Sequence, residues 1–137
     1  MRTQKHEGYR KLKVYQKAHR LALEIHKMSL ALPKFELYEE GSQIRRSFKS
    51  VSSNIVEGFS LRHYKNEYLR CLSLAYASSQ ETIEHLDYLF ETGSLSDEEL
   101  YSRLHKGYDD LCGVLSNLIQ SVREKHETNI FIKKTDD

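Results

Sequence analysis

The sequence has little of what β-sheets, membrane spans and disulfide frameworks require. Its 137 residues include one Pro, six Gly, two Cys and no Trp, whereas 30% are charged. Because Pro and Gly, which are typical of turns, are few, the composition favours helices over sheets. No run approaches the roughly 18 apolar residues of a membrane span, and the N-terminus lacks the apolar core of a signal peptide. Cys71 and Cys112 are far apart and outside any CxxC motif, which predicts free, buried thiols in a cytoplasmic protein.

Two segments in the first half of the chain have the apolar spacing of helices, and the length suits a single domain. The first ends before Pro33, because proline cannot continue a helix. The second is predicted to run from an N-cap at Ser42 to Gly58, the residue just past its end. The predicted buried residues are Val14, Ala18, Leu21, Ile25, Met28 and Leu32 in the first helix and Ile44, Phe48, Val51 and Ile55 in the second.

Two longer helices are predicted in the second half. The third spans about Tyr64 to Phe90, with Leu69, Leu72, Tyr76, Ile83, Leu86 and Phe90 as its apolar stripe. The fourth opens with a capping box from Ser96 to Glu99 and continues to Lys125. Short connections between helices favour antiparallel neighbours. The sequence therefore predicts an all-α fold, an antiparallel up-and-down four-helix bundle over residues 1–125, followed by a tail at 126–137.

Helices two and three each have a second line of residues away from the predicted core. On helix three the line is Glu67, Cys71, Leu74, Ser78, Glu81 and His85, and on helix two it is Arg46, Ser50, Ser53 and Glu57. A solvated surface explains such a line on many amphipathic helices. Small and pairing residues favour the competing hypothesis, in which this face contacts another subunit.

The charge is uneven along the chain. The net charge is +1, yet residues 1–35 contain nine Lys or Arg and only two Glu. Lys13, Lys17, Arg20 and Lys27 share the helix face opposite the apolar stripe, and Arg10 extends it. Such a face predicts an anionic partner, RNA or DNA. The alternative is a solvated face that pairs with acidic residues of helix four, and the pI near 7.8 is below that of dedicated nucleic-acid domains.

The chain lacks the motifs that carry common chemistry. It contains no Glu-x-x-His pair, no H-E-x-x-H, no G-x-S-x-G elbow and no Gly-rich phosphate loop. These patterns place metal ligands, nucleophiles or phosphates in enzymes. We therefore predict a protein that is not an enzyme, with no cofactor and no metal.

The stretch from Lys11 to Leu86 resembles the bacterial four-helix bundle proteins of 23S rRNA intervening sequences. The motifs that carry the resemblance are KLKVYQKAHRLALEI (11–25), Pro33 with Glu36-Leu-Tyr38, SQIRRS (42–47), SNIVEG (53–58) and EYLRCLSLA (67–75), followed by Ser78 and Glu81. The resemblance implies a homopentamer. It also implies kinship of fold with the accessory variability proteins of diversity-generating retroelements, which partner a reverse transcriptase and bind nucleic acid. The chain departs from the family pattern at Glu39-Glu-Gly41, at Ser47 and Phe48, and at Ser52, where the family often has Pro.

These patterns give two sets of candidate residues and one functional hypothesis. The residues predicted for subunit-interface or structural polar contacts are Arg45, Arg46, Ser50, Asn54, Glu57, Glu67, Leu74, Ser78 and Glu81. Those predicted for an anionic partner are Arg10, Lys13, Lys17, Arg20 and Lys27. The hypothesis is a homo-oligomeric scaffold that binds nucleic acid or a nucleic-acid-handling protein. The alternative is a protein-interaction adaptor that binds no nucleic acid.

Overall fold

The computed structural model describes residues 4–126, with side chains from residue 8 onward. Its elements are η1 (Gln4–Lys11), α1 (Lys13–Leu30), η2 (Lys34–Leu37), α2 (Glu40–Ser60), α3 (Lys65–Glu91) and α4 (Glu98–Lys125). No strand occurs in this range, so the all-α prediction is confirmed. Of the predicted tail, only His126 is within the described residues. Among the charged residues counted in residues 1–35, Arg2 and the side chains of Lys5 and Glu7 lie outside the described part of the chain.

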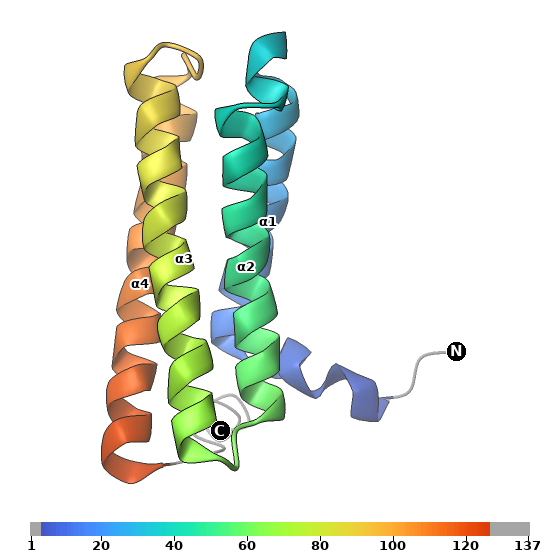
Figure 1. Ribbon diagram of the computed structural model, residues 1–137, viewed down its shortest axis with the longest axis vertical. Coiled ribbons are helices and arrows are strands. Elements are labelled where there is room, and N and C mark those ends of the chain that lie inside the picture. The colour runs from blue at the N-terminus through green and yellow to red at the C-terminus, as the bar shows by residue number, and fades with distance from the viewer. Residues whose placement is uncertain (1–3, 127–137) are drawn as a thin grey trace.

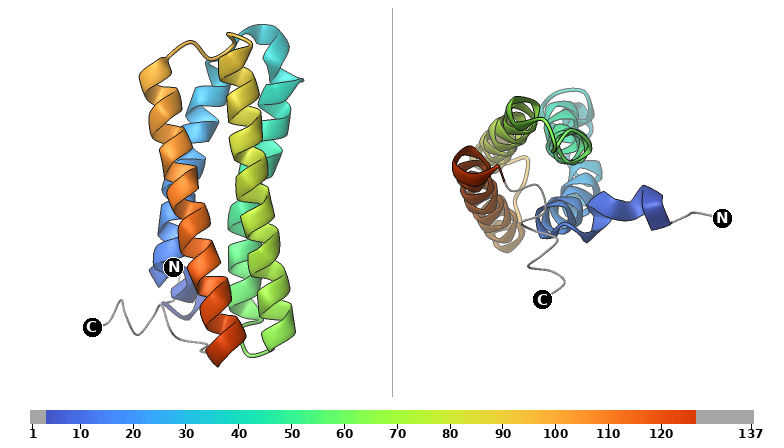
Figure 2. Two further views of the ribbon diagram at one scale, coloured as in Figure 1. Left: turned by 90° about the vertical axis from the view of Figure 1, so that its left-hand side faces the viewer. Right: turned by 90° about the horizontal axis from the view of Figure 1, so that it is seen from below.

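The four α-helices form the predicted up-and-down bundle. α1 and α3 run in one direction, and α2 and α4 run in the other (Figure 1). α2 packs against α1 and α3, and α4 packs against α3 and α1. The helices thus occupy four corners, with α1 and α3 on one diagonal, and η1 projects sideways from the start of α1 (Figure 2). None of the described helices is both long and apolar enough to cross a membrane.

α1 follows its sequence pattern closely. All six residues of its predicted stripe, Val14, Ala18, Leu21, Ile25, Met28 and Leu32, are buried. The helix ends at Leu30, and Pro33 follows with an extended backbone, consistent with the bias of residues before proline away from helix. Periodicity identified these six residues, but the buried face of α1 is wider and also includes Tyr15, Ala22 and Ser29, because the helix packs against both α2 and α4.

Both predicted ends of α2 are wrong. The helix begins at Glu40 rather than after a cap at Ser42, and the buried Glu36 carboxylate accepts a hydrogen bond from the Glu40 amide at 3.2 Å. At the other end the helix continues through Gly58 to Ser60. A Cβ at Gly58 would lie 3.1 Å from the Cβ of Cys71, so this glycine permits the close approach of α2 to α3 and does not end the helix.

The predicted buried line of α3 is displaced. The fully buried residues are Tyr68, Cys71, Leu72, Ala75, Ser79, Thr82, Leu86 and Leu89, whereas Leu69, Tyr76, Ile83 and Phe90 are half-buried. Cys71, which we predicted on the outer line, is completely buried. α3 contacts both α2 and α4, and its contact with α2 uses small and hydroxyl side chains that an apolar pattern does not mark.

α4 begins one residue later than the capping-box prediction. Asp97, not Ser96, is the N-cap, and its Oδ1 accepts a hydrogen bond from the Leu100 amide at 3.0 Å. Glu98 and Glu99 follow in the first turn, where negative charge favours the positive end of the helix dipole. The helix ends at Lys125, as predicted. Both cysteines are free and buried, which confirms that prediction.

Candidate functional site

A seam of small polar side chains joins α2 to α3. The hydroxyls of Ser47 and Thr82 are 2.9 Å apart, as are those of Ser50 and Ser78. Asn54 donates from Nδ2 to the Ser50 carbonyl oxygen at 2.9 Å. Three of the predicted contact residues, Ser50, Asn54 and Ser78, therefore make structural contacts within the chain.

Charged groups close the two ends of this seam. At one end the Arg70 guanidinium lies 3.6 Å from the Glu57 carboxylate and 3.2 Å from that of Glu67. At the other end His85 lies between α2 and α3, with Nδ1 2.7 Å from Glu40 and Nε2 3.8 Å from Glu81. Glu57 and Glu67 are exposed, and exposed pairs of this kind contribute little to stability.

The remaining predicted contact residues separate into one inward and two outward side chains. Arg45 donates from Nη2 to the Leu37 carbonyl oxygen at 2.6 Å and from Nη1 to the Ser29 hydroxyl at 3.3 Å. It therefore ties the α1–α2 connection together. Arg46 and Leu74 are exposed, and they remain available to a partner.

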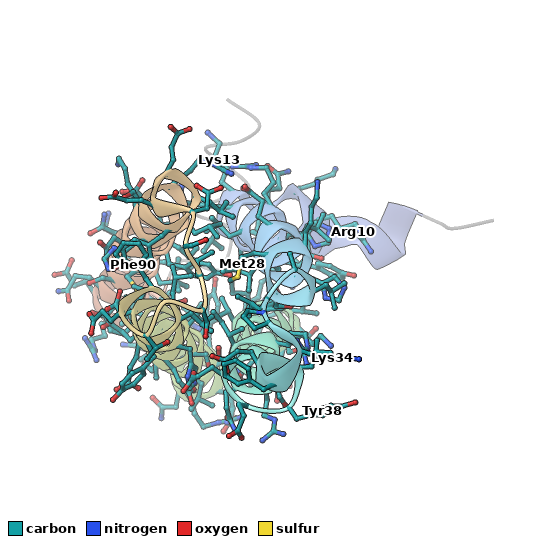
Figure 3. All side chains as sticks on the ribbon, turned by 90° about the horizontal axis from the view of Figure 1, so that it is seen from above. Arg10, Lys13, Met28, Lys34, Tyr38 and Phe90 are labelled. Carbon is teal, nitrogen blue, oxygen red and sulfur yellow. The ribbon has the colours of Figure 1, made fainter. Side chains whose placement is uncertain are left out.

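The five predicted basic residues lie along the outside of η1 and α1. Lys13, Arg20 and Lys27 are exposed, and Arg10 and Lys17 are half-buried. Figure 3 shows Met28 pointing into the bundle, whereas Arg10 and Lys13 are at its periphery. None of the five forms an ion pair with a carboxylate of residues 8–126. Lys13, Arg20 and Lys27 therefore present their charges to the outside at positions spread along α1.

Aromatic rings accompany the cations at the start of α1. The Arg10 guanidinium lies over the Tyr9 ring, 5.3 Å from its centroid. Tyr9 meets Tyr15 edge to face at 5.0 Å, and Tyr15 stacks on His19 at 5.5 Å. The sequence analysis missed these rings because it weighed only charge. The alternation of Tyr with Arg and Lys between residues 9 and 17 was the available signal.

The C-terminal half of α1 lies close to both a cation and carboxylates from the region where α4 begins. Glu24 forms an ion pair with Arg103 of α4. Beside this pair, Lys27 lines a hollow of about 460 Å³ together with Asp97, the N-cap of α4, and Glu99 of α4. The Glu24–Arg103 pair joins an acid of α1 to a base of α4, the reverse of the predicted alternative in which cations of α1 pair with acidic residues of α4. Among the five basic residues, Lys27 comes nearest to that alternative, because Asp97 and Glu99 line the same hollow and partly offset its charge.

The sequence and the described fold together match a known family. Residues 10–117 match the family of the 23S rRNA-intervening sequence protein. The chain belongs to this family. In structure it is similar to a protein of unknown function from the S23 ribosomal protein family of Bacteroides thetaiotaomicron, with a TM-score of 0.71 and 22% sequence identity. The similarity covers 78% of this chain and 95% of that one. No curated protein matches the chain.

Both cysteine thiols have raised pKa values in this member of the 23S rRNA-intervening sequence family. Burial raises the pKa of the Cys71 thiol, and the nearby Glu57 carboxylate raises it further. Burial also raises the pKa of Cys112. A thiol with a raised pKa is a poor nucleophile near neutral pH. Within residues 4–126 no three His, Cys, Asp or Glu side chains are grouped as a metal site requires.

Proposed function

We propose that this chain is a non-enzymatic, homo-oligomeric helical scaffold that binds nucleic acid through the basic surface at the start of α1. The basic start is defined as Arg10, Lys13 and Lys17, with the Tyr9 ring beside them. One observation carries the proposal: Lys13 is exposed, Arg10 and Lys17 are half-buried, none of the three pairs with a carboxylate of residues 8–126, and the Arg10 guanidinium lies over the half-buried Tyr9 ring. Cations that track a phosphate backbone, with rings on which bases stack, are the usual elements of single-strand binding.

Assembly strengthens this proposal. A single copy offers three cations at the basic start, and three phosphate contacts give weak binding. A homopentamer, as the resemblance to the family implies, repeats the surface five times. Several phosphate contacts made together produce tight binding with steep salt dependence. RNA or DNA would supply these phosphates directly, and a nucleic-acid-handling protein such as a reverse transcriptase is the alternative partner.

The polar side chains away from α1 support the non-enzymatic part of the proposal. The hydroxyls of Ser47, Ser50, Ser78 and Thr82 are engaged with one another across the α2–α3 seam. Their positions are explained by helix packing, without a catalytic role. The free, buried cysteines support a cytoplasmic location, because thiols stay reduced there.

Fluorescence anisotropy with labelled single-stranded RNA tests the proposal. Binding should weaken strongly between about 50 and about 200 mM salt. In the variant Lys13→Glu/Lys17→Glu, the slope of log K against log salt should fall by about two for each subunit engaged. The matched control Lys49→Glu/Lys65→Glu makes the same charge change at exposed positions of α2 and α3 and should bind like the wild type.

Three other outcomes of this experiment would each contradict a different part of the proposal. If the wild type shows no salt-sensitive binding to RNA or DNA, the nucleic-acid part of the proposal is overturned. An assembled protein without such binding would support the competing function, a protein-interaction adaptor. Loss of binding in the control as large as in the α1 variant would mean that net charge, and not the basic start, is responsible.

A further inference from the structure

A hollow of about 500 Å³ lies between the neighbouring helices α1 and α2. We call it the α1–α2 hollow. Its walls include His19, Leu23 and His26 of α1 and Lys49 and Ser53 of α2, and all five are exposed. Sites for small molecules commonly have volumes of about 300 to 1,000 Å³. The α1–α2 hollow is therefore large enough for a small organic molecule that enters from the surface.

The floor of the α1–α2 hollow is apolar. Ala22 is 7% exposed and Phe48 5% exposed, and both line the hollow. On the α1 side Leu23, which is 59% exposed, extends this apolar surface outward. A molecule that covers Leu23 removes its side chain from water, which favours binding. The floor therefore fits a ligand with an apolar body.

The polar groups around this floor are bases and hydroxyls. No Asp or Glu of residues 8–126 lines the α1–α2 hollow, in contrast to the hollow beside Lys27, which Asp97 and Glu99 line. The ammonium of Lys49 pairs with no carboxylate of the described chain. A site whose charged groups have one sign attracts ligands of the opposite sign. The α1–α2 hollow therefore favours an anion.

Neighbouring aromatic rings hold the two histidines of the α1–α2 hollow. His19 stacks on Tyr15 with ring centroids 5.5 Å apart, and its Nδ1 is 3.5 Å from the Tyr15 hydroxyl. His26 meets Phe48 edge to face at 6.3 Å. Side chains that are already held in place lose less freedom when a ligand binds. An imidazole N–H can donate a hydrogen bond to a ligand oxygen.

One hydroxyl of the α1–α2 hollow has no protein partner. A serine inside a helix can donate to the carbonyl oxygen four residues earlier, as Ser60 and Ser79 do. Ser52 lines the hollow, and its Oγ is shielded from water and has no hydrogen-bond partner in residues 8–126. A buried hydroxyl without a partner is costly. A ligand oxygen would satisfy the Ser52 hydroxyl without breaking a bond within the protein.

We infer that the α1–α2 hollow binds a small organic anion, a carboxylate with an apolar chain of the length found in medium-chain fatty acids. The carboxylate lies against Lys49 and Ser52, which are three residues apart and therefore share one face of α2. The apolar chain lies over Ala22, Leu23 and Phe48. Charge selects the anion, and the apolar floor selects its chain.

Isothermal titration calorimetry with matched ligands tests the inference. Octanoate should bind to the wild type. 1-Octanol has the same chain without the charge and should bind about tenfold more weakly, and acetate, which has the charge without the chain, should give no binding heat. The basic start does not line the α1–α2 hollow, so this test is independent of the proposed nucleic-acid binding.

Variants with matched controls place the ligand in the α1–α2 hollow. Lys49→Gln should raise the dissociation constant of octanoate about threefold to fivefold, whereas Lys65→Gln, at an exposed position of α3 outside the hollow, should leave it unchanged. Leu23→Glu places a carboxylate beside the ligand and should abolish detectable binding. Leu30→Glu makes the same change at a position of α1 that is 57% exposed and outside the hollow, so it should bind like the wild type.

Ser52→Ala tests the hydroxyl separately. It removes a group that no atom of residues 8–126 satisfies, so the variant should stay folded while the dissociation constant of octanoate rises about threefold. Circular dichroism and thermal unfolding establish that every variant is folded at the temperature of the titration.

Three results would overturn the inference. A folded wild type that gives no binding heat with millimolar octanoate has no such site. Equal affinity for octanoate and 1-octanol would show that the α1–α2 hollow does not select an anion. Octanoate binding that is unchanged in both Lys49→Gln and Leu23→Glu would place the ligand elsewhere on the molecule.

Discussion

The α2–α3 seam and the outer surface of α1 both contain polar residues at helical spacing, but only those of the seam bond to one another within the chain. In the seam, hydroxyls pair with hydroxyls at 2.9 Å and a glycine brings the two backbones close. On α1, the cations lie outward without ion-pairing carboxylates in residues 8–126. The polar groups of the seam are already satisfied within the chain. Those of α1 are exposed or half-buried and carry no such internal contacts, so the seam supports the fold, whereas α1 is the surface that the proposed function uses.

The largest expected effect comes from widening the seam. Gly58→Leu would force α2 away from α3, because even a Cβ at this position would be 3.1 Å from the Cβ of Cys71. We expect the free energy of unfolding to fall by about 3 kcal/mol. Urea unfolding followed by circular dichroism measures it.

Gly113→Leu is the matched control. A Cβ there meets nothing within 4 Å, so leucine should stabilise α4 by roughly 0.5 to 1 kcal/mol through helix propensity. Equal losses in the two variants would contradict the special closeness of α2 to α3.

The next effect tests whether the seam hydroxyls depend on one another. Thr82→Val removes one partner of the buried Ser47 hydroxyl, which can still donate to the Ile44 carbonyl oxygen at 3.1 Å, and we expect a loss of about 1 kcal/mol in the free energy of unfolding. Ser47→Ala should cost about the same. The double variant removes both groups and should cost clearly less than the two single losses together, giving a coupling of about 1 kcal/mol in a double-mutant cycle. Strict additivity would show that the hydroxyls do not act as a pair.

A pH-dependent effect should follow from Tyr68, which packs beside Gly58 in the same seam. Burial raises the pKa of Tyr68 to about 12, although the nearby Arg62 cation lowers it in part. The folded protein thus holds the phenolic proton after the unfolded chain has begun to release it near pH 10. Stability from this group is complete below pH 10 and is lost as the pH rises toward 12.

Tyr68→Phe should therefore flatten the fall in unfolding free energy above pH 10, by on the order of 1 kcal/mol at pH 11. Tyr38→Phe, at an exposed position of the α1–α2 connection, should leave the slope unchanged. Urea midpoints at pH 9, 10 and 11 provide the comparison, and identical slopes for the wild type and Tyr68→Phe would contradict the burial of the hydroxyl.

The contrast between the α2–α3 seam and the outer surface of α1 also explains which features could be predicted from the sequence and which could not. It predicted four helices, their order and the buried stripe of α1, because α1 turns large apolar side chains to one side and charges to the other. It placed Cys71 on the outside and Gly58 past a helix end. Both errors have one cause: a seam built of Ser, Thr, Cys and Gly has no apolar period, so nothing local distinguishes it from a solvated face.

The candidate site was likewise only partly predictable from local sequence patterns. The cations of α1 could be identified from their spacing in the sequence alone, because they lie on the helix face opposite the apolar stripe. The different surroundings of these cations could not be identified in this way. Asp97 and Glu99, at the start of α4, line the same hollow as Lys27, and only tertiary packing brings them there.

The smallest expected effect is on the α1 side of the comparison. Lys13→Glu/Lys17→Glu changes the charge of the surface by four units but breaks no ion pair with residues 8–126. The free energy of unfolding at neutral pH should therefore stay within about 0.5 kcal/mol of the wild type, as for most surface substitutions. Paired with a loss of RNA binding, this result would separate function from stability at the same two residues. A loss as large as that of Thr82→Val would instead indicate that these lysines hold the fold, and the contrast between α1 and the seam would no longer stand.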